Sequence, residues 1–354
     1  MTRYYTAVCD GLRERGVELN VPLVSSKCDF HTPLSRRTLW LHRIPFAVRV
    51  MDYLSRRLFR RAVRQGQYDV ILFTSPEFDS RFLDERADAP FLMVVHDLMT
   101  CVTAPDGLFD AAGPGMTSLL YAACRASLVL CISNDTRDAL LKQVVVDPRR
   151  VVVVPTGNLL ASARATPTTS KLPEKFLLFV GERSGRKGFY SLVRALQPIL
   201  QEYPDLQLVC TGRLSHTEED YLSRWGLGGG VTAVVADDST LVALYQRAFA
   251  LVYPSLYEGF GLPVLEAMHF NCPVITTQEG ALREIAGSAA LFVDPFAVDS
   301  SAPSSIESAV RKLLEEPETR QEYIARGAAQ AALFRVPQMM DAFRDALVRA
   351  AKDD

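Results

Sequence analysis

Residues 250–268 read Ala250-Leu-Val-Tyr-Pro-Ser-Leu-Tyr-Glu-Gly-Phe-Gly-Leu-Pro-Val-Leu-Glu-Ala-Met268, and they pass from a strand pattern through a loop into a helix pattern. The run Ala250–Tyr253 is short, apolar and unbroken, which is typical of a strand buried on both faces. Pro263 suits the first turn of a helix, where a backbone N–H is not needed. A buried strand that leads directly into a helix is the building unit of a parallel α/β sheet.

The loop of this unit suits a ligand that carries phosphate. Gly259 and Gly261 let backbone N–H groups approach a ligand closely, and the N-terminus of the next helix adds partial positive charge. Glu258 on the loop can accept sugar hydroxyls, and Glu266, expected in the first helical turn, can accept the paired hydroxyls of a ribose. This pattern predicts a nucleotide-sugar site. The alternative is a tight strand-to-helix turn with two solvated carboxylates.

The same alternation of strand and helix patterns continues along the chain. Short β-branched runs predict strands at Val17–Val24, Val70–Phe73, Phe91–Val95, Leu128–Cys131, Val151–Val154, Phe176–Val180, Leu206–Cys210, Val231–Val235, Ala250–Tyr253 and Pro273–Thr276. Amphipathic runs predict helices that include Thr2–Arg15, Asp135–Val144, Phe189–Glu202, Ser239–Ala248, Ser304–Glu316 and about Pro337–Lys352. Strands that alternate with such helices predict parallel sheets covered on both faces.

The length of 354 residues exceeds one typical core, and the segment NLLASARATPTTSKLP, Asn158–Pro173, interrupts the alternation. We therefore predict an N-terminal Rossmann-like domain at 1–158, a linker at 159–173 and a second such domain at 174–335. A last helix is expected within 336–354, with a return to the first domain as one option. Open α/β sheets bind ligands at the carboxyl ends of their strands, so a central cleft between the two domains is expected to hold the site.

The composition narrows the class of protein. A net charge of −2 disfavours nucleic acid as a partner, and no apolar run reaches the roughly 18–20 residues that span a bilayer. The seven cysteines are scattered without a Cys-x-x-Cys pair, which favours a reducing, cytoplasmic location. The five histidines are dispersed, so we expect neither a metal site nor a cofactor.

The segment 36–64 carries nine arginines against the single acid Asp52, with apolar residues running between them. The arginines are Arg36, Arg37, Arg43, Arg49, Arg56, Arg57, Arg60, Arg61 and Arg64. This pattern predicts a helix with a basic side and an apolar side. One interpretation is a helix that packs on the core with a solvated basic face. The other is peripheral contact with anionic membrane lipids or with a phosphorylated acceptor.

The string Glu258–Glu266 resembles the E-x7-E signature of retaining GT-B glycosyltransferases of family 4, also described as glycosyl transferases group 1. The resemblance covers about Tyr68 to about Phe296. Further fitting segments are Leu241–Ala248, Asn271–Thr277, Gly280–Gly287 and Ala289–Pro295. The resemblance implies an α/β GT-B fold, in which two Rossmann-like, doubly wound parallel-sheet domains face a central cleft. It also implies that Glu258 contacts the transferred sugar and that Glu266 holds the ribose. The backbone around the glycines would bind sugar and diphosphate, at Gly259, Phe260, Gly261 and Leu262.

A second motif, Phe179-Val-Gly-Glu-Arg-Ser-Gly-Arg-Lys-Gly188, places Lys187 just before a predicted helix N-terminus, beside a phosphate position. The resemblance implies that Lys187, with a nearby arginine, neutralises the leaving diphosphate. Arg183 and Arg186 are both available for that role. A solvated basic turn is the alternative interpretation of this motif.

A third motif, Val94-Val-His-Asp97, delivers His96 to the carboxyl end of a strand. A histidine there can act as a general base, a hydrogen-bond donor or a metal ligand, but no neighbouring His or Cys pattern supports a metal. The resemblance implies that His96 lies between the donor sugar and the acceptor. The alternative is a loop histidine whose hydrogen bonds are satisfied within the protein.

The resemblance carried by these motifs implies a retaining, metal-independent glycosyltransferase that moves a hexose from GDP-mannose or a UDP-hexose to a glycan or lipid-linked acceptor. The chain begins with Thr2–Tyr5 inside a helix pattern, so the first strand and Gly-rich loop of the family are expected to be missing. That departure motivates the alternative of a catalytically weak nucleotide-sugar-binding subunit that supports a partner glycosyltransferase. A Rossmann dehydrogenase is disfavoured because no Gly-x-Gly-x-x-Gly follows an early strand.

Overall fold

The computed structural model describes a set of residue ranges separated by gaps: 2–19, 57, 61, 68–73, 89–98, 114–165, 172–183, 185–294 and 306–352. The chain divides into two compact units. The first comprises Met1–Ile132, Arg137–Val154 and Pro337–Asp354, and the second comprises Ser133–Thr136 and Pro155–Val336. The predicted strand Val17–Val24 lies mostly outside the described residues, and its described positions 17–19 form no strand. The arginine-rich segment 36–64 also lies outside them, except for the exposed Arg57 and Arg61.

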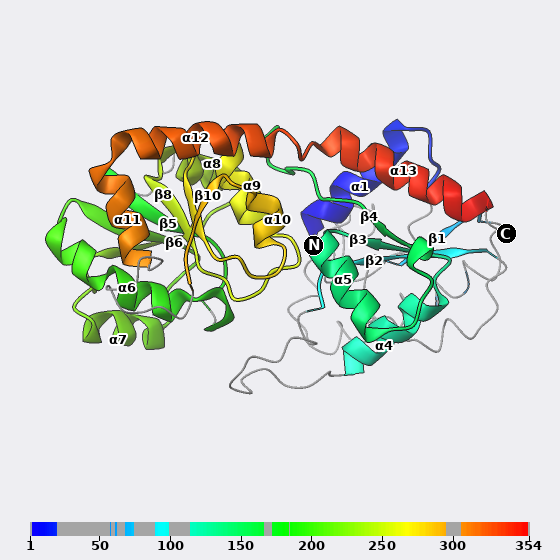
Figure 1. Ribbon diagram of the computed structural model, residues 1–354, viewed down its shortest axis with the longest axis horizontal. Helices are drawn as coiled ribbons and strands as arrows, with labels where there is room; N and C mark the ends of the chain where they lie inside the picture. The colour runs from blue at the N-terminus through cyan, green and yellow to red at the C-terminus, as the bar shows by residue number, and fades with distance from the viewer. Residues whose placement is uncertain are drawn as a thin grey trace. The chain divides into compact units, whose positions relative to one another are not determined.

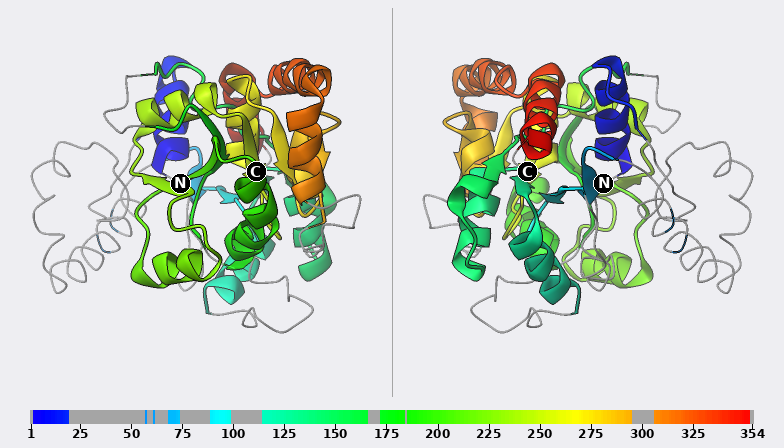
Figure 2. Two further views of the ribbon diagram at one scale, coloured as in Figure 1. Left: turned by 90° about the vertical axis from the view of Figure 1, so that its left-hand side faces the viewer. Right: turned by 90° about the vertical axis from the view of Figure 1, so that its right-hand side faces the viewer.

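The first unit contains a parallel sheet with the strand order β1-β2-β3-β4. Its strands are β1 (Ile71–Phe73), β2 (Phe91–Val95), β3 (Leu128–Cys131) and β4 (Val151–Val153). Its helices are α1 (Thr2–Glu14), α4 (Pro114–Arg125), α5 (Asn134–Gln143), the 3-10 turn η4 (Pro148–Arg150) and α13 (Val336–Lys352). Within this unit α1 and α13 lie over one face of the sheet, and α4 and α5 lie over the other (Figures 1 and 2). The sheet is therefore covered on both faces, as parallel strands require.

The C-terminal helix α13 packs directly against α1 within the first unit. Arg15 donates a hydrogen bond from Nε to Asp341 Oδ1 at 2.8 Å. A Cβ added to Gly11 would lie 2.7 Å from Cγ of Met340, so glycine permits this close approach of the two helices. The last helix of the chain thus completes the layer that the first helix begins.

The second unit contains a six-stranded parallel sheet with the order β10-β9-β8-β5-β6-β7. Its strands are β5 (Lys175–Phe179), β6 (Leu206–Thr211), β7 (Val231–Val234), β8 (Ala250–Tyr253), β9 (Val274–Thr276) and β10 (Ala290–Phe292). The helices are η5 (Gly185–Lys187), α6 (Phe189–Glu202), α7 (His216–Arg224), α8 (Asp238–Arg247), α9 (Leu262–His269), α10 (Leu282–Ala286), α11 (Ile306–Glu315) and α12 (Pro317–Ala331). One apolar core joins α6, α7 and α11 to alternate strand residues such as Leu177 and Phe179, whereas α8 and α9 pack on the sheet from its opposite face (Figure 1).

The strand order places a switch point at β5. The chain runs outward from β5 through β6 to β7, then returns to lay β8 on the other side of β5. The loops that leave β5 and β8 therefore start side by side at the carboxyl edge of the sheet and lead to helices on opposite faces. Such a switch point opens a crevice that binds ligands in doubly wound sheets.

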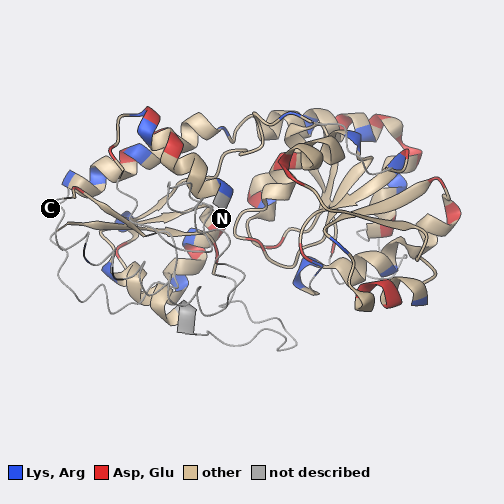
Figure 3. Ribbon diagram, turned by 180° about the vertical axis from the view of Figure 1, so that it is seen from behind, with Lys and Arg blue, Asp and Glu red and all other residues tan. Residues whose placement is uncertain are grey.

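The structure confirms the predicted α/β class. Each of the nine predicted strands from Val70–Phe73 to Pro273–Thr276 is observed, with ends that differ by no more than one residue. The short strand β10 was not predicted as a strand, although it lies in Ala289–Pro295, one of the segments that fit the family. No helix in the described ranges is long and apolar enough to span a bilayer. Basic and acidic residues are interspersed on the helices of both units (Figure 3), in keeping with a net charge of −2.

Candidate functional site

The switch point of the second unit brings two loops together. Lys187 ends η5 in the loop after β5, and Glu258 lies in the loop between β8 and α9. Lys187 Nζ forms an ion pair with Glu258 Oε1 and donates to the hydroxyl of Tyr253 at 2.6 Å. The two motifs that the sequence singled out separately therefore form one site.

The carboxylate of Glu258 is held through one of its two oxygens. Oε1 accepts from the Tyr253 hydroxyl at 2.8 Å, from the Ser255 hydroxyl at 2.6 Å and from Lys187 Nζ. Arg186 Nη1 lies 3.5 Å from the same oxygen. Within the described part of the chain, none of these contacts reaches Oε2.

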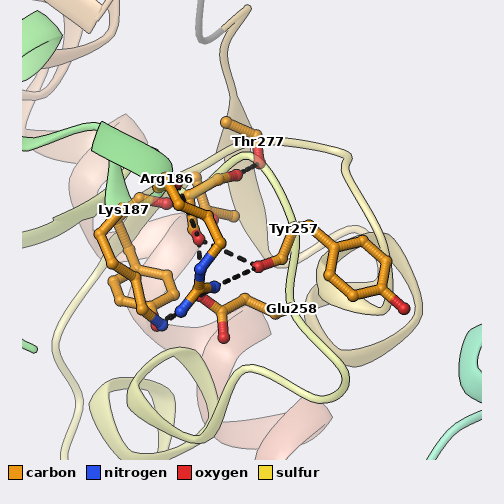
Figure 4. A network of polar contacts seen from close by, with 8 residues as sticks. Arg186, Lys187, Tyr257, Glu258 and Thr277 are labelled. Atoms are coloured by element: carbon orange, nitrogen blue, oxygen red, sulfur yellow. Dashed lines mark hydrogen bonds and ion pairs between the residues drawn. The ribbon is translucent and has the colours of Figure 1, made fainter. Parts of the chain in front are cut away.

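Arg186 forms hydrogen bonds between the loop after β5 and the loop after β8 (Figure 4). Its Nη1 donates to the carbonyl of Tyr257 at 2.7 Å, and its own carbonyl accepts from the backbone N–H of Leu256 at 2.8 Å. Figure 4 shows the side chains of Arg186 and Lys187 converging on Glu258. Two cations thus share one carboxylate at the carboxyl edge of the sheet.

Burial and charge act in opposite directions on Lys187. Burial lowers the pKa of Lys187 below its ordinary value, whereas the charge of Glu258 and the hydrogen bond to it oppose that shift. An ammonium group in this position gains from a close anion. A diphosphate can supply the same compensation as Glu258.

Glycines shape the loop that precedes α9. Gly261 is the N-cap residue of α9, with a φ of 95°, and a Cβ there would lie 2.6 Å from Cδ2 of Leu282. Gly259 and Phe260 are buried in the same loop, and the Phe260 ring packs edge-on against Phe334 at 5.9 Å between centroids. Leu262 is half-buried and begins the helix. The side chain of Phe260 thus packs in the core, so the backbone is the part of this loop that suits an anion.

Glu266 does not lie in the first turn of α9, and that prediction was wrong. The helix begins at Leu262, so Glu266 is its fifth residue and belongs to the second turn. Its side chain is only 3% exposed, and Oε2 accepts from the hydroxyl of Tyr245 at 2.8 Å. Burial, and next the charge of Glu266, raise the pKa of Tyr245, so this phenol stays protonated and donates.

The side chain of Arg183 contacts residues other than Lys187 and Glu258. Its Nε forms an ion pair with Glu218 Oε1 at 2.7 Å, and its two terminal nitrogens donate to the carbonyls of Thr211 and Arg213. Glu218 in turn completes the capping box of α7 with Ser215. Of the two arginines that the sequence left open, the structure therefore brings Arg186 to Glu258 and uses Arg183 to hold the β6–α7 loop.

His96 belongs to the first unit, where it directly follows β2. Its Nε2 lies 2.7 Å from the hydroxyl of Tyr5, and the ring of Tyr4 packs edge-on against it at 4.9 Å between centroids. Burial lowers the pKa of His96 to about 4, so the imidazole is neutral at pH 7. A neutral imidazole can donate a hydrogen bond or accept one, and Tyr5 is its observed partner.

Sequence reasoning missed three hydroxyl groups of this site, on Tyr245, Tyr253 and Ser255. Tyr253 and Ser255 lie five and three positions before Glu258, in the stretch that carries the motif. Both side chains carry a hydroxyl and lie close to Glu258 in the sequence, which could have indicated that they donate to its carboxylate. Tyr245 lies 21 positions before Glu266, so no local pattern connects the two.

Comparisons with known proteins agree with this geometry. The model of Glycosyltransferase Family 4 matches residues 1–158, and the model of Glycosyl transferases group 1 matches residues 165–330. An O-antigen chain mannosyltransferase B of Escherichia coli is 29% identical over 335 residues, which cover 89% of this chain and 83% of that protein. Sucrose-phosphate synthase from Thermosynechococcus elongatus has a similar structure, with a TM-score of 0.67 and 23% identity over 83% of this chain and 77% of that one. HepE from Anabaena, solved with UDP and glucose, has a TM-score of 0.65 and 20% identity over 83% and 82% of the two chains.

Two parallel α/β units, with cationic and carboxylate groups at a switch point beside a glycine-rich helix N-terminus, define a GT-B glycosyltransferase. The chain belongs to glycosyltransferase family 4, and it is an enzyme that transfers sugar moieties. The alternative of a catalytically weak nucleotide-sugar-binding subunit that supports a partner glycosyltransferase is not favoured. Both family models and the E. coli relative describe transferases.

Proposed function

We propose that this glycosyltransferase moves a hexose from a nucleotide-diphosphate sugar to a glycan or lipid-linked acceptor, with retention of the anomeric configuration and without a metal ion. The observation that carries the proposal is the Lys187–Glu258 pair at the β5/β8 switch point. GDP-mannose is the first candidate donor, because the E. coli relative, which this chain matches over 83% of its length, is a mannosyltransferase. A UDP-hexose is the second, because HepE was solved with UDP and glucose.

The leaving group dictates the chemistry in this proposal. The bond between the anomeric carbon and the phosphate oxygen breaks, and the nucleoside diphosphate leaves with the electron pair. In this proposal Lys187, Arg186 and the N-terminus of α9 stabilise the charge that develops on it, and the position of both cations at one carboxylate in the loop before that helix supports their role. The side chains of Lys187 and Arg186 thus neutralise the diphosphate in this proposal, so that no divalent metal ion is needed. Glu266 accepts the hydroxyls of the ribose.

Retention is proposed to follow from attack on the face that the diphosphate leaves. The acceptor hydroxyl forms the new bond to the anomeric carbon, and its proton passes to the phosphate oxygen of the departing diphosphate. Glu258 has one oxygen engaged by protein donors, which suits a carboxylate that holds sugar hydroxyls better than one that attacks carbon. His96, neutral at pH 7, is proposed to contact the substrate on the acceptor side.

A panel of UDP-, GDP- and dTDP-sugars tests the proposal, with the wild-type chain compared with Glu258→Ala and Lys187→Ala. We expect turnover of GDP-mannose or a UDP-hexose, unchanged by a metal chelator, and a fall of about 100- to 1000-fold in kcat for Lys187→Ala. Proton NMR of the product reports whether the configuration is retained. Donor binding without turnover, over the whole panel and with added glycan acceptors, would contradict the transferase role.

We also propose a cytoplasmic enzyme that meets its acceptor at an anionic membrane through the arginine-rich segment 36–64. Sedimentation with vesicles containing about one-third anionic lipid tests this contact at low and at physiological salt. Binding that weakens with salt is expected. An absence of binding at low salt would exclude the membrane role and leave a soluble glycan as the proposed acceptor.

A further inference from the structure

Four protein donors converge on a single oxygen of Glu258, and two of them are neutral hydroxyls. Tyr253 is the last residue of β8 and is 1% exposed, and Ser255 lies two residues further along the chain and is fully buried. Burial, and next the charge of Glu258, raise the pKa of Tyr253, so its hydroxyl remains a donor. The other two donors are cations, the Lys187 ammonium and, at 3.5 Å, Nη1 of Arg186.

The two cations and the two hydroxyls respond differently to a bound diphosphate. Under the proposed function the ammonium of Lys187 also pairs with the bound diphosphate. Its ion pair with Glu258 is then weaker. The two residues that carry the hydroxyls are held at the carboxyl edge of the sheet through their backbone carbonyls. The Tyr253 carbonyl accepts from the hydroxyl of Thr276 at 2.8 Å, and the Ser255 carbonyl accepts from the hydroxyl of Thr277.

We propose that Tyr253, together with Ser255, is a positioning residue that keeps Oε1 of Glu258 anchored while Lys187 serves the diphosphate. Oε2 is then the oxygen that receives a hydroxyl of the donor sugar. The inference rests on the proposed function and deepens it. Its specific consequence is that Tyr253 acts on recognition of the sugar and leaves recognition of the nucleoside diphosphate unchanged.

Tyr253→Phe tests this role, because it removes one hydroxyl and keeps the buried ring. The dissociation constants of UDP, UDP-glucose, GDP and GDP-mannose are measured by calorimetry, and kcat and KM are measured for the donor that is turned over. We expect the affinities for UDP and GDP to stay within about twofold of wild type, while kcat/KM falls by about 10- to 100-fold.

A double-mutant cycle identifies Glu258 as the group through which Tyr253 acts. In the Glu258→Ala background the carboxylate is gone, so adding Tyr253→Phe should change the ratio of the nucleotide-sugar and nucleoside-diphosphate affinities no further. Ser255→Ala should reproduce the effect of Tyr253→Phe at a smaller size, and it serves as the second variant if Tyr253→Phe fails to fold. Tyr221→Phe is the matched control, since it removes a half-buried hydroxyl that donates to the Tyr190 carbonyl at 3.2 Å.

Two results would overturn the positioning role. One is an equal loss of affinity for nucleoside diphosphate and nucleotide sugar in Tyr253→Phe. The other is full additivity with Glu258→Ala. If the wild-type chain binds UDP-glucose or GDP-mannose without turnover, the proposed function is contradicted but the role of Tyr253 is not. The ratio of the nucleotide-sugar affinity to the nucleoside-diphosphate affinity then still tests that role. If the chain bound neither, the same cycle in the free energy of unfolding would test the role of Tyr253, with an absence of coupling as the contradicting outcome.

Discussion

Gly188 and Pro254 are so close that no side chain fits between them. A Cβ on Gly188 would lie 2.2 Å from the carbonyl oxygen of Pro254, and the φ of Gly188 is +71°. Gly188 caps α6 directly after Lys187, and Pro254 directly follows β8. This contact packs the loop that carries Lys187 against the loop that carries Glu258, and it holds Lys187 within reach of that carboxylate.

Gly188→Ala is therefore expected to destabilise the second unit and displace Lys187. The added methyl group meets backbone and adopts a disfavoured φ, so a loss of about 1–3 kcal/mol in the free energy of unfolding is expected, with reduced turnover. Urea unfolding measures the loss. Gly185→Ala is the matched control, because a Cβ added there would have no atom within 4 Å and the φ of Gly185 is not positive. Equal stability of the two variants would contradict the contact.

Arg183→Ala and Arg186→Ala should separate stability from catalysis. The ion pair of Arg183 with Glu218 is buried, with side-chain exposures of 8% and 11%, so Arg183→Ala leaves an unpaired carboxylate and costs about 3 kcal/mol. Arg186→Ala removes a cation from the Lys187–Glu258 pair and is expected to lower kcat by at least about 10-fold, with a smaller loss of stability. Thermal unfolding and steady-state kinetics measure both. The reverse pattern would assign the diphosphate to Arg183.

Tyr245→Phe should weaken the recognition of ribose. The buried carboxylate of Glu266 loses the hydroxyl that donates to it at 2.8 Å, so we expect a loss of about 1–3 kcal/mol in stability. We also expect weaker binding of UDP and GDP, and less discrimination against their 2′,3′-dideoxy forms. Calorimetry with both forms measures this discrimination. Tyr323→Phe, at a half-buried position of α12, is the control, and unchanged discrimination in Tyr245→Phe would separate Glu266 from the ribose.

His96 is expected to make stability depend on pH in the acid range. Its pKa is about 4 in the folded chain and about 6.5 in the unfolded chain, because burial disfavours the charged ring. Between these values the unfolded chain binds the proton and the folded chain does not, so stability falls as pH drops from about 6.5 to about 4. The full contribution is at most about 3 kcal/mol.

Urea unfolding at several pH values between 4 and 7 measures this dependence. His96→Asn should reduce the slope of stability against pH in that window, whereas His216→Gln, at an exposed position of α7, should leave it unchanged. The same slope in wild type and His96→Asn would show that His96 is already solvated in the folded chain.

Much of the fold could be predicted from local patterns. The unbroken run Ala250–Tyr253, the glycines after it and Pro263 indicate a strand, a loop and a helix, and β8 and α9 follow that order. Lys187 was likewise predicted to precede a helix, and α6 begins at Phe189. Such features depend on neighbouring residues, whose spacing is visible in the chain. The turn that holds Glu266 was predicted wrongly, because the first residue of a helix depends on capping geometry and not on apolar spacing alone.

The sequence by itself determined the class of fold, nine of the strands, several of the helices, and the residue types that suit a nucleotide sugar. Only the tertiary structure decided that Lys187 meets Glu258, 71 positions away, and that the Tyr253 hydroxyl donates to Oε1 of that carboxylate. It also decided that Arg186 joins this pair while Arg183 pairs with Glu218. The physical reason is the strand order. Because β8 returns to lie beside β5, two loops far apart in the chain share one edge of the sheet, and the partner of each polar group is set by that packing.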